Sequence, residues 1–248
     1  MIISNKNNTV ITDITSWENA FIEVDNSKHW KEGRSAHSLA TYFLSPTIEQ
    51  SFGMQKIKEC INACGYDDME FTHARIEHES RFDPYKGSGR MQDMVIWAQC
   101  DKCRIVVCIE AKVDETFGNT LADAYNESVK YVKQHPTSKR KARIEDLCQK
   151  YLKIQSAEIL EENGIRYQLL HYLAGSISEA KSYGNIVFMP IMVFKTSENY
   201  DFIKAKKNKE DYDTFMRTLN FAYDKQKLIY KNTIDDVEIY TCYIDISL

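Results

Sequence analysis

Hydrophobic and polar positions along the chain follow two periods, and each period predicts a type of secondary structure. Apolar residues at helical spacing indicate helices over residues 35–44, 48–64, 120–135, 144–162, 167–183 and 211–223. Stretches rich in β-branched and aromatic residues indicate strands over residues 70–82, 91–99, 104–113, 186–194 and 237–246. Residues 1–25 mix short apolar pieces and support no firm prediction, and residues 138–143 are expected to form a basic loop.

The order of these elements predicts an α/β fold with a mixed central β-sheet flanked by helices on both faces. The strand at 186–194 is a nearly unbroken apolar run, which is typical of a strand covered on both sides. A length of 248 residues fits one domain. We therefore expect a single domain over residues 1–248, with a core over about 30–195 and a C-terminal helix-and-strand extension over 196–248.

Composition narrows the classes of protein to consider. The 43% hydrophobic content is enough for a core without disulfides or metals. The net charge of -4 excludes a protein that binds nucleic acid by bulk charge alone, but it leaves room for local basic patches. Two basic runs qualify, over residues 139–143 and 204–209, and either is alternatively a solvated loop.

The chain lacks an apolar run near the roughly 18 residues that a bilayer span requires, and its first residues do not resemble a signal peptide. We therefore expect no membrane association, a cytoplasmic location and reduced cysteines. The pair Cys100-x-x-Cys103 raises the alternative of a zinc or redox site. A structural zinc needs four ligands, and no second pair of this spacing supplies the rest.

The hairpin predicted over residues 91–113 brings charged groups together. A turn centred between Asp101 and Lys102 places Asp93 opposite Glu110, and directly opposed side chains point to the same face. Lys112 lies two residues beyond Glu110 and therefore shares that face. Two opposed carboxylates repel each other unless a cation bridges them, and oxygen ligands suit Mg²⁺ or Mn²⁺. The alternative is a charged strand face that points into solvent.

These residues resemble the PD-(D/E)XK nuclease superfamily, the restriction-endonuclease-like phosphodiesterases. Its signature is an acidic residue on one strand and Glu-x-Lys on the next, here Asp93 and Glu110-Ala111-Lys112. The resemblance implies a core of helix, three strands, helix and strand, with these three residues in catalysis and both acids on the metal. An E-x-K tripeptide is common, and a second Glu-Ala-Lys begins at Glu179 on a predicted helix, so strand context carries the match.

Further segments extend the resemblance. Gln168 and Tyr172 are four residues apart on one helix face and look like the Q-x-x-x-Y element of some superfamily branches, which implies that they support the site. The alternative is a surface Gln and a core Tyr. Residues 30–36 and 110–118 also resemble an uncharacterised bacterial family with this core.

Three more residues are candidates for the site. Arg34 and Ser35, at a predicted helix start, are expected to bind a phosphate of the nucleic acid, or else to cap the helix. Glu77 is the candidate for a further metal carboxylate, as superfamily members often recruit an extra acid. Its neighbour Glu79 is expected on an exposed strand face, and His78 is expected to point away from the acids.

The expected function is metal-dependent phosphodiester hydrolysis of nucleic acid, with DNA as the expected substrate and Mg²⁺ or Mn²⁺ as the cofactor. A role in restricting foreign DNA is an analogy with the superfamily. The alternative is a catalytically inactive nuclease fold that binds nucleic acid or a protein partner. Whether the protein forms a homodimer stays open.

Overall fold

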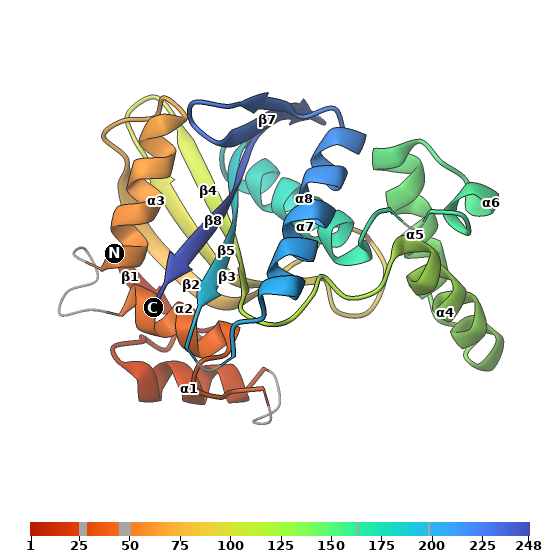
Figure 1. Cartoon of the computed structure of the whole chain (residues 1–248), viewed down its shortest axis with the longest axis horizontal. Helices are drawn as coiled ribbons and strands as arrows, with labels where there is room; N and C mark the ends of the chain where they lie inside the picture. The colour runs from red at the N-terminus through yellow and green to blue at the C-terminus, as the bar shows by residue number, and fades with distance from the viewer. Residues whose placement is uncertain (25–28, 45–50, 163, 198) are drawn as a thin grey trace.

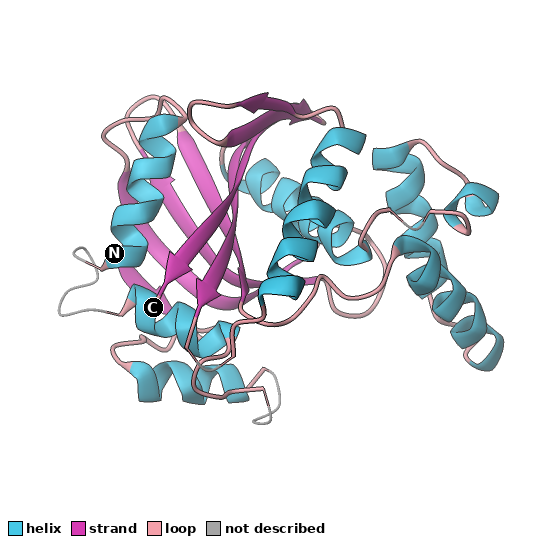
Figure 2. Cartoon of the chain, viewed as in Figure 1, coloured by secondary structure: helices cyan, strands magenta, loops and turns pink. Residues whose placement is uncertain are grey.

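A computed structural model describes residues 1–24, 29–44, 51–162, 164–197 and 199–248. Over these residues the fold is α/β, as predicted, with a mixed sheet of eight strands between two layers of helices (Figure 1, Figure 2). The strands are β1 (Ile2–Ser4), β2 (Glu70–Ser80), β3 (Arg90–Gln99), β4 (Arg104–Lys112), β5 (Ile186–Lys195), β6 (Ala222–Asp224), β7 (Ile229–Ile234) and β8 (Val237–Ser247).

The sheet has the order β1-β2-β3-β4-β5-β8-β7-β6. The hairpin β3–β4 is antiparallel, whereas β4, β5 and β8 run parallel to one another at its centre. Most residues of these central strands are buried, as expected for strands that are covered on both faces. The predicted C-terminal extension therefore contributes a central strand, β8, to the same sheet as the core.

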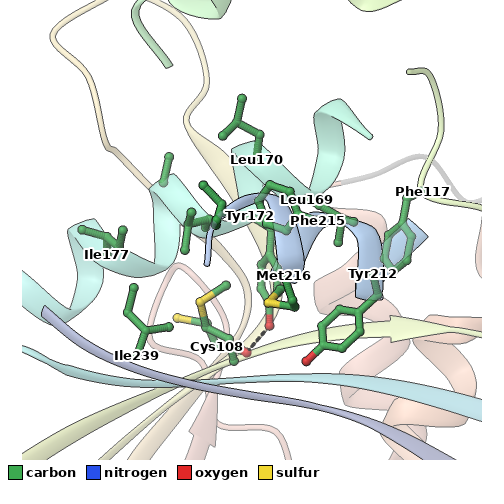
Figure 3. Packing of buried hydrophobic residues seen from close by; sticks show 14 of the residues in the cluster. Cys108, Phe117, Leu169, Leu170, Tyr172, Ile177, Tyr212, Phe215, Met216 and Ile239 are labelled. Atoms are coloured by element: carbon green, nitrogen blue, oxygen red, sulfur yellow. Dashed lines mark hydrogen bonds between the residues drawn. The ribbon is translucent and has the colours of Figure 1, made fainter. Parts of the chain in front are cut away.

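Each face of the sheet carries its own hydrophobic cluster. Met94, Ile96 and Ala98 on β3 point to one face, and Val95 and Trp97 point to the other, as strand geometry requires. The first face packs against α1 (Ile14–Ile22), α2 (Ser35–Phe43) and α3 (Phe52–Ala63). The second packs against α7 (Tyr167–Tyr183) and α8 (Phe202–Thr218), whose buried side chains Figure 3 shows.

A small helical lobe lies beyond α7, at the right of Figure 1. It consists of α4 (Leu121–Gln134), α5 (Arg140–Leu147), the π-helical turn η2 (Cys148–Leu152) and α6 (Ser156–Ile159). Among the described residues, every helix is too short or too polar to cross a bilayer.

Most predicted elements are confirmed, with small differences at their ends. The helix at 167–183 has the predicted bounds, and the hairpin strands differ by one residue at an end. The helix predicted over 120–135 is α4, which Thr120 caps. The start of the helix predicted over 48–64 lies outside the described residues. The part that is described begins at Phe52, with Ser51 as its N-cap.

Three predictions about helices were wrong, in kind or in extent. The single helix over 144–162 is two helices, because the chain passes through the π turn and then a left-handed residue, Lys153, at φ 61°. The basic stretch 138–143 is mostly helical rather than a loop, since α5 begins at Arg140. The helix expected over 211–223 starts earlier, at Phe202, and ends at Thr218.

The early start of α8 has an electrostatic reason. Lys207 and Lys209 each form an ion pair with an aspartate four residues later, and such pairs support a lysine-rich helix. Beyond Thr218, strands β6 and β7 were not predicted, because their short and mostly exposed sequences have no strong alternation.

Candidate functional site

The candidate site lies where β3 and β4 separate. The hairpin follows the predicted register, and its last backbone pair is Met94–Ile109. The ladder ends one position before Asp93 and Glu110. In place of main-chain pairing, the Asp93 carboxylate accepts a hydrogen bond from the backbone N–H of Ala111 at 2.6 Å. The strands therefore open a gap, and the polar groups of the site gather in it.

Strand β2 is distorted at the same level. Its ladder with β3 passes over Glu77 and Asp93 and pairs only the residues on either side. Glu77 has a φ of 45°, a left-handed conformation that is uncommon for a residue with a side chain. Strained backbone of this kind clusters at functional sites. Glu77 lies with Asp93 in the wall of the same cavity.

Glu110 is the most heavily contacted side chain of the site. It is 2% exposed, and its two oxygens accept from Arg90, from the Lys112 ammonium at 2.8 Å and from the Gln168 amide at 2.7 Å. Burial alone would raise the pKa of Glu110, but the charges of Arg90 and Lys112 outweigh it and lower the pKa. The predicted shared face of Glu110 and Lys112 is confirmed.

Asp93 and Lys112 respond differently to the same surroundings. Burial, and then the charge of Glu110, raises the pKa of Asp93 to about 7. Burial would lower the pKa of Lys112, but Glu110 and Asp93 outweigh it and raise the pKa, so the ammonium stays charged at neutral pH. The site therefore combines a carboxylate that titrates near neutrality with a permanent cation.

Two neighbouring cavities open onto these groups. The first has a volume of about 350 Å³, and its wall includes Glu77, Arg90, Asp93, Glu110, Lys112, Glu115 and Gln168. The second, of about 490 Å³, shares Ser35, Glu77, Asp93 and Glu115 with the first and extends to His29, Lys31 and Arg34. The strands β2, β3 and β4 and the helices α2 and α7 thus contribute to one site.

Arg34 and Ser35 lie at the start of α2, as predicted, and border the second cavity. Arg34 forms an ion pair with Asp114 at 2.8 Å. The Ser35 hydroxyl hydrogen-bonds the carboxylate of Glu115, and the pKa of Glu115 is lowered because Lys112 and this hydrogen bond outweigh the effect of its burial. Their predicted phosphate-binding role stays a prediction.

The helix pair Gln168 and Tyr172 divides between the site and the core. Gln168 reaches Glu110, whereas the Tyr172 ring is buried and its hydroxyl donates to the Cys108 carbonyl at 2.6 Å (Figure 3). Tyr172 does not line either cavity. It supports the site from below, with the guanidinium of Arg90 5.9 Å from its ring centroid.

Other polar groups of this region lie outside the site. His78 contacts Glu179 on α7 at 3.0 Å and lines neither cavity. Since α7 also covers the face on which Glu110 lies, the expectation that His78 points away from the acids is not confirmed. Glu79 was expected on an exposed strand face. Its carboxylate instead accepts a hydrogen bond from the Gly89 backbone N–H at 2.7 Å and holds the loop before β3. Cys100 and Cys103 lie at the far end of the hairpin, with their sulfur atoms 3.0 Å apart.

Arg90 is the main residue that the sequence did not single out. It lies three positions before Asp93, and in a regular strand the two side chains would point to opposite faces. The distortion between them lets Arg90 reach Glu110. Gly175 on α7 makes this possible, because a Cβ there would lie 2.8 Å from the Cβ of Arg90. Glu115, three residues after Lys112, is a further residue that lines both cavities.

The residues fit a hard divalent cation by the chemistry of their donors. Asp93, Glu110 and Glu77 offer only carboxylate oxygens, which are the ligands that Mg²⁺ and Mn²⁺ prefer. The raised pKa of Asp93 indicates a carboxylate that lacks a sufficient counter-charge. Within the part of the chain that the structure describes, no three acidic, His or Cys side chains are already arranged as ligands, since Glu110 is held by Arg90, Lys112 and Gln168.

Comparison with known proteins identifies a family but no activity. No curated protein and no solved structure matches the chain. Residues 10–248 match a family described as a domain of unknown function, DUF6946. Because this match covers nearly the whole chain, the protein belongs to the DUF6946 family.

Proposed function

We propose that this protein is a metal-dependent phosphodiester hydrolase of the PD-(D/E)XK type that acts on nucleic acid, with DNA as its substrate. The observation that carries the proposal is the cavity of about 350 Å³ that gathers Asp93, Glu110, Lys112 and Gln168 from three elements. Four acids, a lysine and an arginine in one cavity wall are a costly arrangement for a surface without function.

Asp93, Glu110 and Glu77 would hold the Mg²⁺ or Mn²⁺ ion. When bound, such an ion polarises a phosphoryl oxygen and lowers the pKa of a water molecule. The remaining roles belong to the chain itself. Lys112, a cation at neutral pH, orients a water by hydrogen bonding or neutralises charge on a phosphoryl oxygen. Gln168 fixes the orientation of Glu110, and Tyr172 fixes β4 beneath them.

The second cavity suits the phosphate groups next to the scissile bond. Its wall joins Arg34, Lys31 and His29 to the acids of the site. The N-terminus of α2, with the Ser35 backbone N–H, adds partial positive charge on the same side. We therefore assign Arg34 and Ser35 to nucleic-acid binding.

One observation favours a second candidate function, a nuclease fold that binds nucleic acid or a protein without cutting it. The charge of Glu110 is already balanced by Arg90 and Lys112. If Arg90 takes the place of a cation permanently, the site binds no metal. This candidate predicts retention of DNA without cleavage and no rise in melting temperature with Mn²⁺.

A nicking assay on supercoiled plasmid tests the proposal, with Mg²⁺ or Mn²⁺ and with wild type, Glu110→Ala and Lys112→Ala. We expect cleavage by wild type only, and a loss of at least about 10²-fold in each variant. Equal cleavage by all three proteins would refute these catalytic roles. Cleavage by none, with DNA retained on the protein, would favour the non-catalytic candidate.

The biological setting is a proposal by analogy. Phosphodiester hydrolases with this core are suited to restricting foreign DNA, and such a role for this protein rests on fold-level analogy alone. A homodimer is compatible with the proposed activity, and light scattering coupled to size-exclusion chromatography determines whether it forms.

A further inference from the structure

A basic groove lies next to the site, between the loop before β3, the turn from α4 to α5, and α7. It is a cavity of about 680 Å³, and its lining includes Lys86, Lys139, Arg140 and Arg143 together with Tyr167 and His171. Among the described residues that line it, four are cationic and none is acidic. This concentration of positive charge stands out in a chain whose net charge is -4.

Part of the positive charge of the groove is not neutralised by neighbouring acids. Lys86 and Lys139 are exposed and form no ion pair within the described residues, and Arg140 reaches Glu127 only at 3.5 Å. The second basic run, on α8, is neutralised to a similar extent, since Lys207 and Lys209 pair with aspartates at 2.5 Å and 2.6 Å and Lys204 reaches Asp201 only at 3.6 Å. The groove differs because its cations line one cavity, where a ligand can contact several of them at once.

Arg143 gives the groove its shape. Its guanidinium donates to the Ser88 carbonyl at 2.8 Å and pairs with Asp83 at 2.6 Å, which ties α5 to the loop before β3. Across the groove, Tyr167 and His171 stack with their centroids 5.4 Å apart. The wall is therefore fixed by packing and hydrogen bonds, while Lys86, Lys139 and Arg140 project from its rim.

The groove and the site share no lining residue, but two segments of the chain border both. Tyr167 directly precedes Gln168, whose amide contacts Glu110 at 2.7 Å. On the other wall, Ser88 lies two residues before Arg90. A linear polyanion with one group at the Asp93–Glu110 cavity is therefore positioned to reach the neighbouring groove.

We propose that the basic groove binds the sugar–phosphate backbone of a nucleic-acid strand on one side of the bond at the site. The inference rests on the proposed function for what happens at the site, but binding in the groove needs neither metal nor cleavage. Lys and Arg side chains bind phosphates without reading sequence, so the groove contributes affinity and direction rather than sequence preference.

Binding is measured by fluorescence anisotropy in EDTA, with fluorescein-labelled single-stranded DNA and the corresponding duplex. The groove variant is Lys139→Ala/Arg140→Ala, and the matched control is Lys204→Ala/Lys206→Ala, which removes the same charge from exposed positions on α8. We expect the groove variant to bind about tenfold more weakly and the control to stay within about twofold of wild type. The slope of log affinity against log salt should fall by about 1.4–1.8 in the groove variant alone.

Three results would contradict the proposed role of the groove. These are equal weakening of DNA binding in both double variants, no weakening in either, and competition by polyglutamate as effective as that by unlabelled DNA. The last would assign the groove to an acidic protein. Circular dichroism of both variants checks that they fold.

Cleavage in Mn²⁺ at low substrate concentration separates this inference from the proposed function. If wild type and the groove variant cut equally well, the proposed role of the groove is refuted and the proposed hydrolase activity is supported. If wild type does not cut while the groove variant alone loses DNA binding, the proposed hydrolase activity is refuted and the role of the groove is supported.

Discussion

The β3–β4 hairpin has two ends that differ in their physical character. At the closed end the chain turns through Cys100 and Cys103, joined by a backbone hydrogen bond of 2.9 Å, with exposed polar residues between them. At the open end the ladder stops, and Glu110 and Lys112 are only 2% and 5% exposed. The same two strands thus carry a solvated turn and a buried charge cluster.

The difference teaches where substitutions should matter. Charged groups removed from water are stable only when all their partners are present, so the loss of one leaves the others buried and uncompensated. Solvated groups at a turn lose little, because water replaces their contacts. Four predictions, in order of decreasing effect, test this contrast.

The largest effect is expected from Glu110→Ala. The variant leaves Arg90 and Lys112 buried without their shared carboxylate, so the free energy of unfolding should fall by about 3–5 kcal/mol. Urea unfolding followed by circular dichroism measures it. Glu79→Ala is the control, since that carboxylate is one-third exposed and should cost about 1 kcal/mol. Similar losses of unfolding free energy in both variants would contradict the expected difference between buried and partly exposed charges.

The second largest effect is a dependence of the free energy of unfolding on pH, which Asp93 introduces. The pKa of Asp93 is about 7 in the folded protein, above its ordinary value of 3.8, so folding binds a proton. The contribution of this group to stability is therefore complete below about pH 4 and is lost as the pH rises to about 7, at up to about 1.4 kcal/mol per pH unit.

Unfolding of wild type and Asp93→Asn between pH 4 and pH 8 measures this dependence. The variant cannot titrate there, so it should gain stability relative to wild type as the pH rises and reach a plateau above about pH 7. Millimolar Mg²⁺ should flatten the difference if the carboxylate is a ligand, because the bound cation keeps it ionised. A difference in stability between the two proteins that does not change with pH would show that the pKa of Asp93 is not raised.

The third effect concerns the space that Gly175 leaves for Arg90. Alanine is favoured over glycine in a helix by about 1 kcal/mol, so Gly175→Ala would stabilise an open position. Here the new methyl group would lie 2.8 Å from the Arg90 Cβ and 2.9 Å from the Gln92 amide nitrogen, so we expect a net loss of about 1–2 kcal/mol. Thermal unfolding decides the sign, and a higher melting temperature would mean that α7 moves away without cost.

The smallest effect is expected at the closed end. Cys100→Ser/Cys103→Ser should change the free energy of unfolding by no more than about 0.5 kcal/mol, because the turn is held by backbone hydrogen bonds and is partly solvated. Thermal unfolding with and without a chelator measures it. A fall in melting temperature of wild type with chelator, absent in the variant, would revive the zinc interpretation of this pair.

The parts of the fold that the sequence predicted are those with strong local signals. The bounds of α7 and the register of the hairpin follow from helical periodicity and from a turn between two β-branched runs. Strand alternation was enough to place Glu110 and Lys112 on one face, and the register placed Asp93 level with Glu110. The support that Gln168 gives to Glu110 was predicted from the resemblance to the Q-x-x-x-Y element and not from helical spacing, which related Gln168 only to Tyr172.

The remainder depended on features that local patterns do not carry. Arg90 enters the site because strands β2 and β3 are distorted at Glu77 and Asp93, and a regular alternation would place it on the other face. The break after α5 depends on one residue, Lys153, in a left-handed conformation. The extent of α8 depends on ion pairs between side chains that composition alone records as a basic run followed by acids.

The left-handed backbone of Glu77 has a consequence for laboratory evolution. Glycine is the residue that adopts this conformation without penalty, so Glu77→Gly should relieve strain while it removes a carboxylate from the cavity. A library screened for heat tolerance alone should accumulate glycine at position 77, and a library screened for turnover should keep the acid. The residue recovered there would show which of the two pressures has acted on the chain.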